Sequence, residues 1–125
     1  MCMIDGSERV TPIGEGRYIV ARKEHKCAEC WRKILIGERY HTEAFVSDGE
    51  FATHKTCAHC MVARDWLMAE CGGWVFDFVQ EDVAEHWDEG DHDIRLARLI
   101  VGMRRKWTTR RGDVMRLPQM PAVTP

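Results

Sequence analysis

The feature that most constrains this chain is a pair of Cys-x-x-Cys motifs, at Cys27 and Cys30 and again at Cys57 and Cys60. Residues 31–56 separate the two motifs. A zinc ion takes four soft or borderline ligands in a tetrahedron, and two close pairs joined by a loop supply them. The spacing therefore predicts one zinc ion held by all four thiolates.

A second ligand set competes for the same ion, because His54 and Cys57 form a His-x-x-Cys motif. We favour Cys60 over His54 as the fourth ligand, since the first turn of a helix presents Cys57 and Cys60 to one point. Otherwise His54 is expected to face solvent or the outer side of a hairpin, as are His41 and His59. A four-cysteine site has no open position for an activated water, so the zinc is expected to be structural.

The residues between the two motifs predict a β-hairpin. An Asp-Gly step at 48–49 lies between two strand-like runs, which is the strongest short-range hairpin pattern. A two-residue turn there sets Val46 opposite Phe51 and Tyr40 opposite Cys57. This register returns the second cysteine pair to the neighbourhood of the first.

Helical periodicity and capping residues place three helices after the hairpin. They are expected at 57–70 with Thr56 as the N-cap, at about 77–89, and at 94 to about 108. The predicted fold class is small α+β, with a treble-clef-like zinc core of knuckle, hairpin and helix followed by two helices and a tail. The expected divisions are a loose lead-in at 1–16, the zinc-binding core at 17–76, a helical pair packed on the core at 77–111, and an extended tail at 112–125.

The order of these elements over residues 24–70 resembles a treble clef or zinc ribbon, and the cysteine and histidine spacing is similar to the first zinc module of LIM domains and to PARP-type zinc fingers. Segments 21–27, 37–40 and 56–60 resemble uncharacterised small zinc proteins of phages and bacterial mobile elements. That resemblance implies a protein of the bacterial cytoplasm, including that of a phage-infected cell, which regulates transcription or blocks a host defence complex.

Motifs for catalysis are weak. HNH-type nucleases also carry paired zinc knuckles, but they need an orienting asparagine, and the chain contains none. An HNH-like metal nuclease is therefore a minority alternative, and thiol redox chemistry is disfavoured because two pairs joined by a hairpin suit metal binding better. We expect a non-enzymatic protein without a small-molecule substrate. No apolar run approaches the roughly 20 residues that span a bilayer, so no membrane contact is expected.

Charge is segregated towards the C-terminal end. Residues 77–93 contain eight acidic residues and no Lys or Arg, whereas residues 94–117 contain eight basic residues against one acid. Packing of acids near Arg95 and Arg98 explains part of this pattern. The other basic residues suit a nucleic-acid backbone or an acidic protein surface. The predicted binding residues are Arg104, Arg105, Lys106, Trp107, Arg110, Arg111 and Arg116.

Two functions follow, the first from these charges and the second from what the resemblance to phage and mobile-element proteins implies. The first is a zinc-stabilised protein that binds a nucleic acid or a nucleoprotein complex. The alternative is a phage-encoded, anti-CRISPR-like inhibitor of a host protein or defence complex, acting by protein contact or by mimicry of nucleic acid. The acidic contact surface for the alternative comprises Glu81, Asp82, Glu85, Asp88 and Glu89.

Overall fold

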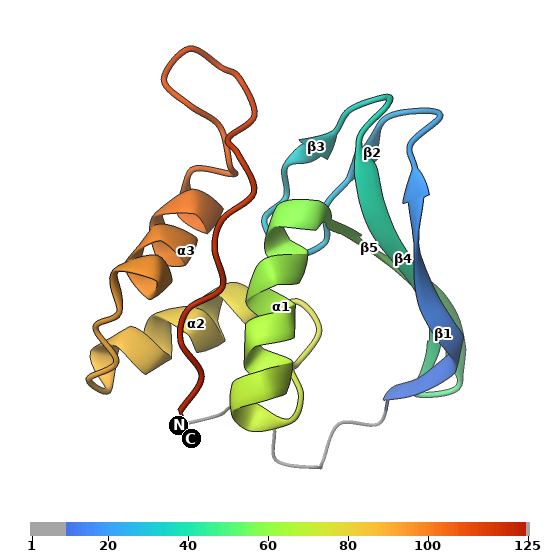
Figure 1. Ribbon diagram of the computed structural model, residues 1–125. Helices are drawn as coiled ribbons and strands as arrows, with labels where there is room; N and C mark the ends of the chain where they lie inside the picture. Colours follow the sequence, from blue (N-terminus) through green and yellow to red (C-terminus); the bar gives the residue numbers. More distant parts are fainter. Residues whose placement is uncertain (1–9, 125) are drawn as a thin grey trace.

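The computed structural model describes residues 10–124, which form two small antiparallel sheets and three helices (Figure 1). This confirms the predicted small α+β class. None of the described helices is long and apolar enough to cross a membrane. The elements are β1 (Val10–Val20), β2 (His25–Lys26), β3 (Lys33–Ile34), β4 (Arg39–Ser47), β5 (Glu50–Cys57), α1 (Ala58–Cys71), α2 (Val79–Asp88) and α3 (Ile94–Arg104).

Strands β4 and β5 form the predicted hairpin. Val46 lies opposite Phe51 and Tyr40 lies opposite Cys57, so the predicted register is confirmed. The turn residues at 48–49 have φ values of 51° and 82°, the left-handed backbone that a tight two-residue hairpin turn of type I′ requires. The hairpin therefore ends with Cys57 beside the start of α1.

Strand β1 extends this sheet at its edge, in the order β1-β4-β5. It begins at Val10, so the prediction of a loose lead-in was wrong for residues 10–16, while residues 1–9 lie outside the described part. The pairing with β4 shifts in register around Gly14, whose φ of 68° allows a bulge. Glycine and Pro12 lower the local strand propensity, and the distant partner β4 overrides it.

Helix α1 packs against the sheet and begins at the metal site. Its N-cap is Cys57 and not the predicted Thr56, and the Cys57 sulfur accepts a hydrogen bond from the backbone N–H of Cys60 at 3.4 Å. Further along the helix, the buried Arg64 donates two hydrogen bonds to the carboxylate of Glu43 on β4, at 2.7 and 3.0 Å. Removal of either partner would leave a charge in a desolvated place, so this ion pair fixes α1 on the sheet.

Helices α2 and α3 pack against each other beside α1 (Figure 1). Helix α3 begins at Ile94 as predicted, with the Asp93 carboxylate accepting from the backbone N–H of Arg95 at 2.9 Å. It ends at Arg104, earlier than the predicted Thr108. Helix α2 is also shorter than the predicted 77–89, because the chain before it turns at Asp77, whose φ of 71° is left-handed.

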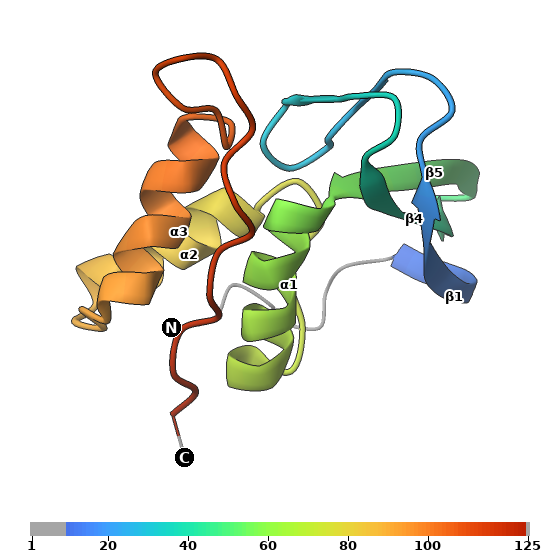
Figure 2. The same ribbon diagram turned by 45° about the horizontal axis from the view of Figure 1, so that its top comes forward.

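After α3 the chain makes a projecting loop and then returns along α1, as both views show (Figures 1 and 2). The carbonyl of Met115 accepts a hydrogen bond from His59 Nε2 at 2.5 Å, and the carbonyl of Ala122 accepts one from Trp66 Nε1 at 3.2 Å. The tail is extended, as predicted, but it is a strap packed on α1 and not a free arm.

Candidate metal centre

The four cysteines of the two motifs converge from three parts of the fold. Cys27 and Cys30 lie on the knuckle turn between β2 and β3, Cys57 ends β5, and Cys60 lies in the first turn of α1. All four are buried, and their sulfur atoms lie within 4.8 Å of one another. A hydrogen bond of 2.8 Å from the backbone N–H of Cys27 to the carbonyl of Arg32 closes the knuckle.

The sulfur spacing fits a tetrahedral ion. Zinc–sulfur bonds of about 2.3 Å give sulfur–sulfur edges of about 3.8 Å in a regular tetrahedron. The Sγ atoms of Cys30 and Cys57 are 3.9 Å apart, far beyond a disulfide bond of about 2.0 Å. The predicted set is therefore confirmed as one closed, four-cysteine zinc site within a treble-clef-like core.

N–H groups of the surrounding chain donate to the sulfur atoms. The backbone N–H of Cys57 donates to Cys27 Sγ at 3.3 Å, and that of Cys60 donates to Cys57 Sγ at 3.4 Å. The indole Nε1 of Trp107 donates to Cys60 Sγ at 3.3 Å. Such donors orient the ligands and spread the thiolate charge. Because Trp107 follows α3, the C-terminal half takes part directly in the zinc site.

Four thiolates around a divalent ion leave a net charge of about −2, which Arg32 partly offsets. Arg32 is buried, and its guanidinium donates to the Glu38 carboxylate at 2.8 and 2.9 Å. Burial lowers the pKa of Arg32, but the hydrogen bonds to Glu38 and the charge of Cys57 outweigh it and raise that pKa overall. A fixed positive charge therefore stands beside the sulfur cluster.

The thiols themselves have opposed proton affinities when no ion balances them. Hydrogen bonds from Cys30, and then from Cys57 and Cys60, lower the pKa of the Cys27 thiol. Burial raises the pKa of the Cys60 thiol. A divalent ion removes this conflict because it stabilises all four thiolates together.

The alternative ligand His54 is outside this cluster. It is buried, at 4% exposure, and its Nε2 lies 2.9 Å from Glu29 Oε2, so the expectation of an outward-facing residue was wrong. Glu29 belongs to the first Cys-x-x-Cys motif and also accepts the backbone N–H groups of Asp77 at 3.0 Å and Val79 at 3.2 Å. Its negative charge at the start of α2 is favourable to that helix. Glu29 therefore links the knuckle to both the hairpin and α2.

Glu29, His54 and Asp77 together form a second group of possible metal donors, within 4.8 Å of one another. Glu29 approaches His54 Nε2, whereas Asp77 lies 4.0 Å from His54 Nδ1, on the other ring nitrogen. The two carboxylates therefore do not converge on one lone pair of the imidazole. The group serves the packing of α2 on the knuckle.

The other two histidines were also expected to face outward, and both are partly enclosed. His59 is buried against the Trp107 ring, with the ring centroids 5.3 Å apart. His41 is half-buried, and its Nδ1 lies 2.9 Å from Glu43 Oε2. Both residues belong to the packing of the hairpin, α1 and the strap.

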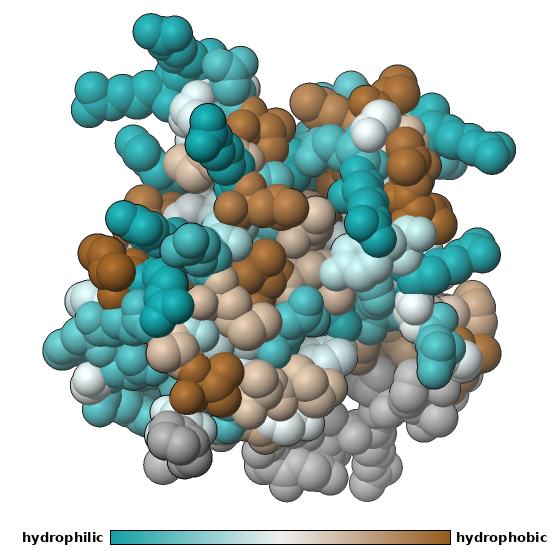
Figure 3. Space-filling view, viewed as in Figure 1, coloured by the Kyte–Doolittle hydropathy of each residue, from teal (hydrophilic) through white to brown (hydrophobic). Residues whose placement is uncertain are grey.

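All of the predicted binding residues lie in the projecting loop, residues 104–116, which we call the basic loop, and all but one of them are exposed. A bridge between Thr108 and Val114 closes it, and Figure 3 shows hydrophilic side chains extending from it. Trp107 is the exception, with 2% exposure. Its own backbone is left-handed, with φ of 53°, so the chain turns back there and directs the indole inward. The exposed members are Arg104, Arg105, Lys106, Arg110, Arg111 and Arg116.

The predicted acidic surface on α2 is smaller than expected. Asp82 is buried, at 1% exposure, and its carboxylate lies 3.6 Å from His86 Nε2 on the inner side of the helix. Arg95 pairs with Asp93, its own helix cap, at 2.9 Å instead of with an acid of α2. The acids that do reach the surface are Glu81, Asp88 and Glu89, with Glu85 half-buried.

Sequence reasoning missed the roles of Glu29 and Trp107. The position of Glu29 between two zinc ligands was the one local sign of its role. The inward turn at Trp107 depends on the backbone after α3. The helical periodicity of apolar residues from 94 to about 108 was the only local pattern that indicated burial of this tryptophan.

We compared the chain with protein-family models, with curated proteins and with solved structures, and none of them matches it. The metal centre, the basic loop and the acidic side of α2 therefore provide the grounds for a function. Of these, the metal centre is coordinatively closed, which directs attention to the two charged surfaces.

Proposed function

We propose that the protein is a non-enzymatic, zinc-stabilised binding protein whose basic loop contacts the phosphate backbone of a nucleic acid. The observation that carries this proposal is the anchoring of the loop. Its exposed cations flank Trp107, whose indole donates to Cys60 Sγ at 3.3 Å. A cationic loop that is ordered in advance loses less conformational entropy on binding than a free tail does.

The arrangement of charge supports the same function. The basic loop contains six exposed basic side chains and a single acid, Asp113. Neutralisation of phosphates by such side chains releases counterions and supplies most of a sequence-independent affinity. The zinc stabilises this arrangement, because it holds Cys60, the residue to which Trp107 anchors the loop.

Salt dependence tests the proposal. Binding to a duplex of about 20 base pairs is measured by fluorescence anisotropy from low to moderate salt, for the wild type and for Arg110→Gln/Arg111→Gln. Each lost phosphate contact reduces the slope of log K against log salt by about 0.9, so a fall of about 2 is expected. Arg98→Gln, an exposed change on α3 outside the loop, is the control and should leave the slope unchanged. Absence of binding at low salt, or an unchanged slope in the double variant, contradicts the proposal.

A second candidate is contact with a host protein through α2, by imitation of nucleic-acid charge. It is favoured by the exposure of Glu81 and Asp88 on a helix that begins beside Phe78, a phenylalanine with 51% exposure. The resemblance to proteins of phages and mobile elements makes a bacterial lysate the suitable source of partners. Partner capture by the wild type and its loss in Glu81→Lys/Asp88→Lys would support this candidate. Retained capture by that variant would reject it.

A further inference from the structure

An exposed tryptophan occupies an unfavourable backbone position on the knuckle. Trp31 follows Cys30 directly, has a φ of 68° and is 60% exposed. This left-handed region favours glycine and is unfavourable for a bulky side chain. The knuckle turn accounts for the backbone, because the N–H of Trp31 donates to the carbonyl of Cys27 at 3.0 Å, but it does not account for a large aromatic side chain that lies mostly in water there. Residues in such sparsely populated backbone regions are common at binding sites.

The side chain that contacts this tryptophan is cationic. Lys26 Nζ lies 4.4 Å from the centroid of the Trp31 ring. A lysine over one face of an exposed indole places a positive charge beside a flat apolar surface. A nucleotide has the complementary pair of features, a flat base and a phosphate.

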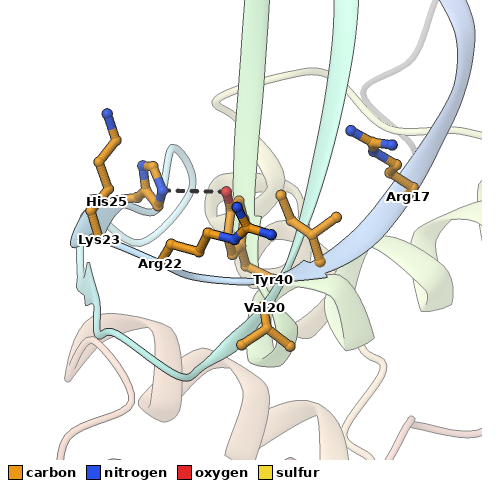
Figure 4. Close-up of a pocket in the computed structure, with 7 residues that line it drawn as sticks. Arg17, Val20, Arg22, Lys23, His25 and Tyr40 are labelled. Carbon is orange, nitrogen blue, oxygen red and sulfur yellow. Dashed lines mark hydrogen bonds between the residues drawn. The ribbon is translucent and has the colours of Figure 1, made fainter.

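A cationic pocket of about 740 Å³ adjoins the knuckle, lined by residues of β1, by the segment that follows it and by Tyr40 of β4. Figure 4 shows Arg17 at one end of it, Lys23 and His25 at the other, and Arg22 between them. None of the described residues that line this pocket is acidic. The hydroxyl of Tyr40, a buried residue on β4, lies 3.3 Å from His25 Nε2 and supports that imidazole.

His25 connects the pocket with the tryptophan, because it also lines the smaller hollow that contains Lys26 and Trp31. Glu24 and Lys33 also line that hollow, and Lys33 Nζ lies 3.4 Å from Glu24 Oε2, so two lysines stand against one acid there. Together the two hollows form one continuous area, which we call the knuckle surface: Arg17, Arg22, Lys23, His25, Lys26 and Trp31.

We propose that the knuckle surface binds single-stranded nucleic acid, with a base stacked on Trp31 and the adjoining phosphates in the cationic pocket. Stacking on a protein side chain requires a base that is not already paired and stacked, and a duplex does not offer one. Lys26 is placed to meet the phosphate of the stacked nucleotide. The basic loop lies at the same end of the molecule as the knuckle (Figures 1 and 2), so one strand can contact both. The inference rests on the proposed function for its class of ligand and on separate residues for its site.

Trp31→Ala tests the stacking contact. Binding is measured by anisotropy with a labelled oligo-dT of about 20 nucleotides, an oligo-rU of equal length, and a duplex. Base stacking on an aromatic residue predicts a loss of about 5- to 100-fold for the single strands. The duplex affinity should not change, and Trp31→Phe should retain most of the single-strand binding. The ratio of dT to rU affinities distinguishes DNA from RNA as the ligand.

Trp31→Gly separates a binding role from a structural one. Glycine relieves the left-handed backbone, so the thermal midpoint should be unchanged or higher while single-strand binding is lost. Zinc content, measured by elemental analysis, should stay the same. In the pocket, Arg22→Gln/Lys23→Gln should reduce the single-strand salt slope by about 1.4, and the Arg98→Gln control should not.

Each outcome bears on a different claim. Single-strand binding by Trp31→Ala that equals the wild type overturns the knuckle proposal, whatever the basic-loop variant does. A loss in Trp31→Ala together with wild-type binding by Arg110→Gln/Arg111→Gln upholds the knuckle surface and rejects the basic loop. Binding through Trp31 to anionic phosphatidylglycerol vesicles, with none to either oligonucleotide, would assign the surface to lipid and overturn the proposal.

Discussion

At the scale of single residues, Trp107 joins the C-terminal half to the zinc site. Its indole donates to Cys60 Sγ, and its ring occupies the space where a side chain at position 102 would lie. Gly102 is therefore required in α3, although a glycine inside a helix costs about 1 kcal/mol relative to alanine. The helix accepts this cost because the indole gains its place beside the metal.

Trp107→Phe keeps most of the ring and removes the N–H donor. Loss of an outer-shell hydrogen bond typically weakens metal binding by about 10- to 100-fold, and we expect the lower end because two backbone donors to sulfur remain. Competition with a chelating dye measures the affinity. Trp66→Phe is the matched control, since it removes the indole N–H that donates to Ala122 and does not touch the metal. Equal zinc affinity in the wild type and Trp107→Phe would contradict a role for this contact.

Residues of the site differed in how far the sequence predicted them. The cysteine ligands were predictable because two short spacings and one hairpin register bring them together. The exposure of His54 was predicted wrongly, because its burial depends on Glu29, which lies 25 positions earlier in the chain. A propensity for strand or helix carries no information on such a pair, so only the folded chain reveals it.

At the scale of elements, the same distinction separates the hairpin from β1. The β4–β5 pairing follows from the two residues at 48–49, whose turn chemistry is local. The β1–β4 pairing joins segments far apart in sequence and tolerates a bulge and a proline. The third helix was predicted from its hydrophobic stripe, but its end was not, because the chain after Arg104 turns to bury Trp107. Local patterns thus gave the elements, and long-range contacts decided their limits.

The packing of the C-terminal strap on α1 leads to a prediction at this scale. Deletion of residues 119–125 removes the carbonyl that accepts from the buried Trp66 and also removes the buried Pro121. A buried donor without a partner costs about 1–3 kcal/mol, so the free energy of unfolding should fall by about that amount. Urea titration measures this as a lower midpoint with a similar slope. Thr124→Val removes only an exposed hydrogen bond to Glu70 and should change stability by less than about 0.5 kcal/mol. Unchanged stability after the deletion would show that the strap is not part of the fold.

At the scale of the whole molecule, the zinc site is the point where its parts meet. The knuckle holds Glu29, which binds the start of α2, and the sulfur of Cys60 accepts from the chain after α3. The hairpin and α1 contribute the second cysteine pair directly. The buried core runs without a break from the cysteines to Leu96 and Leu99 on α3. These links predict that the molecule folds as one unit and that the metal stabilises all of it.

Removal of the metal tests this unity. Structural zinc supplies about 10 kcal/mol or more of folding free energy in small modules, which exceeds the stability that most domains of this size possess. Titration with a strong chelator should therefore abolish the far-UV helical signal and the near-UV tryptophan signal in one coincident transition, and Cys27→Ser should fail to fold in the same way. Freshly purified protein should contain one zinc per chain by elemental analysis. Loss of zinc that leaves the helical signal of α2 and α3 intact would show that the C-terminal half folds independently, and the contacts of Glu29 and Trp107 would then be accessory to the fold.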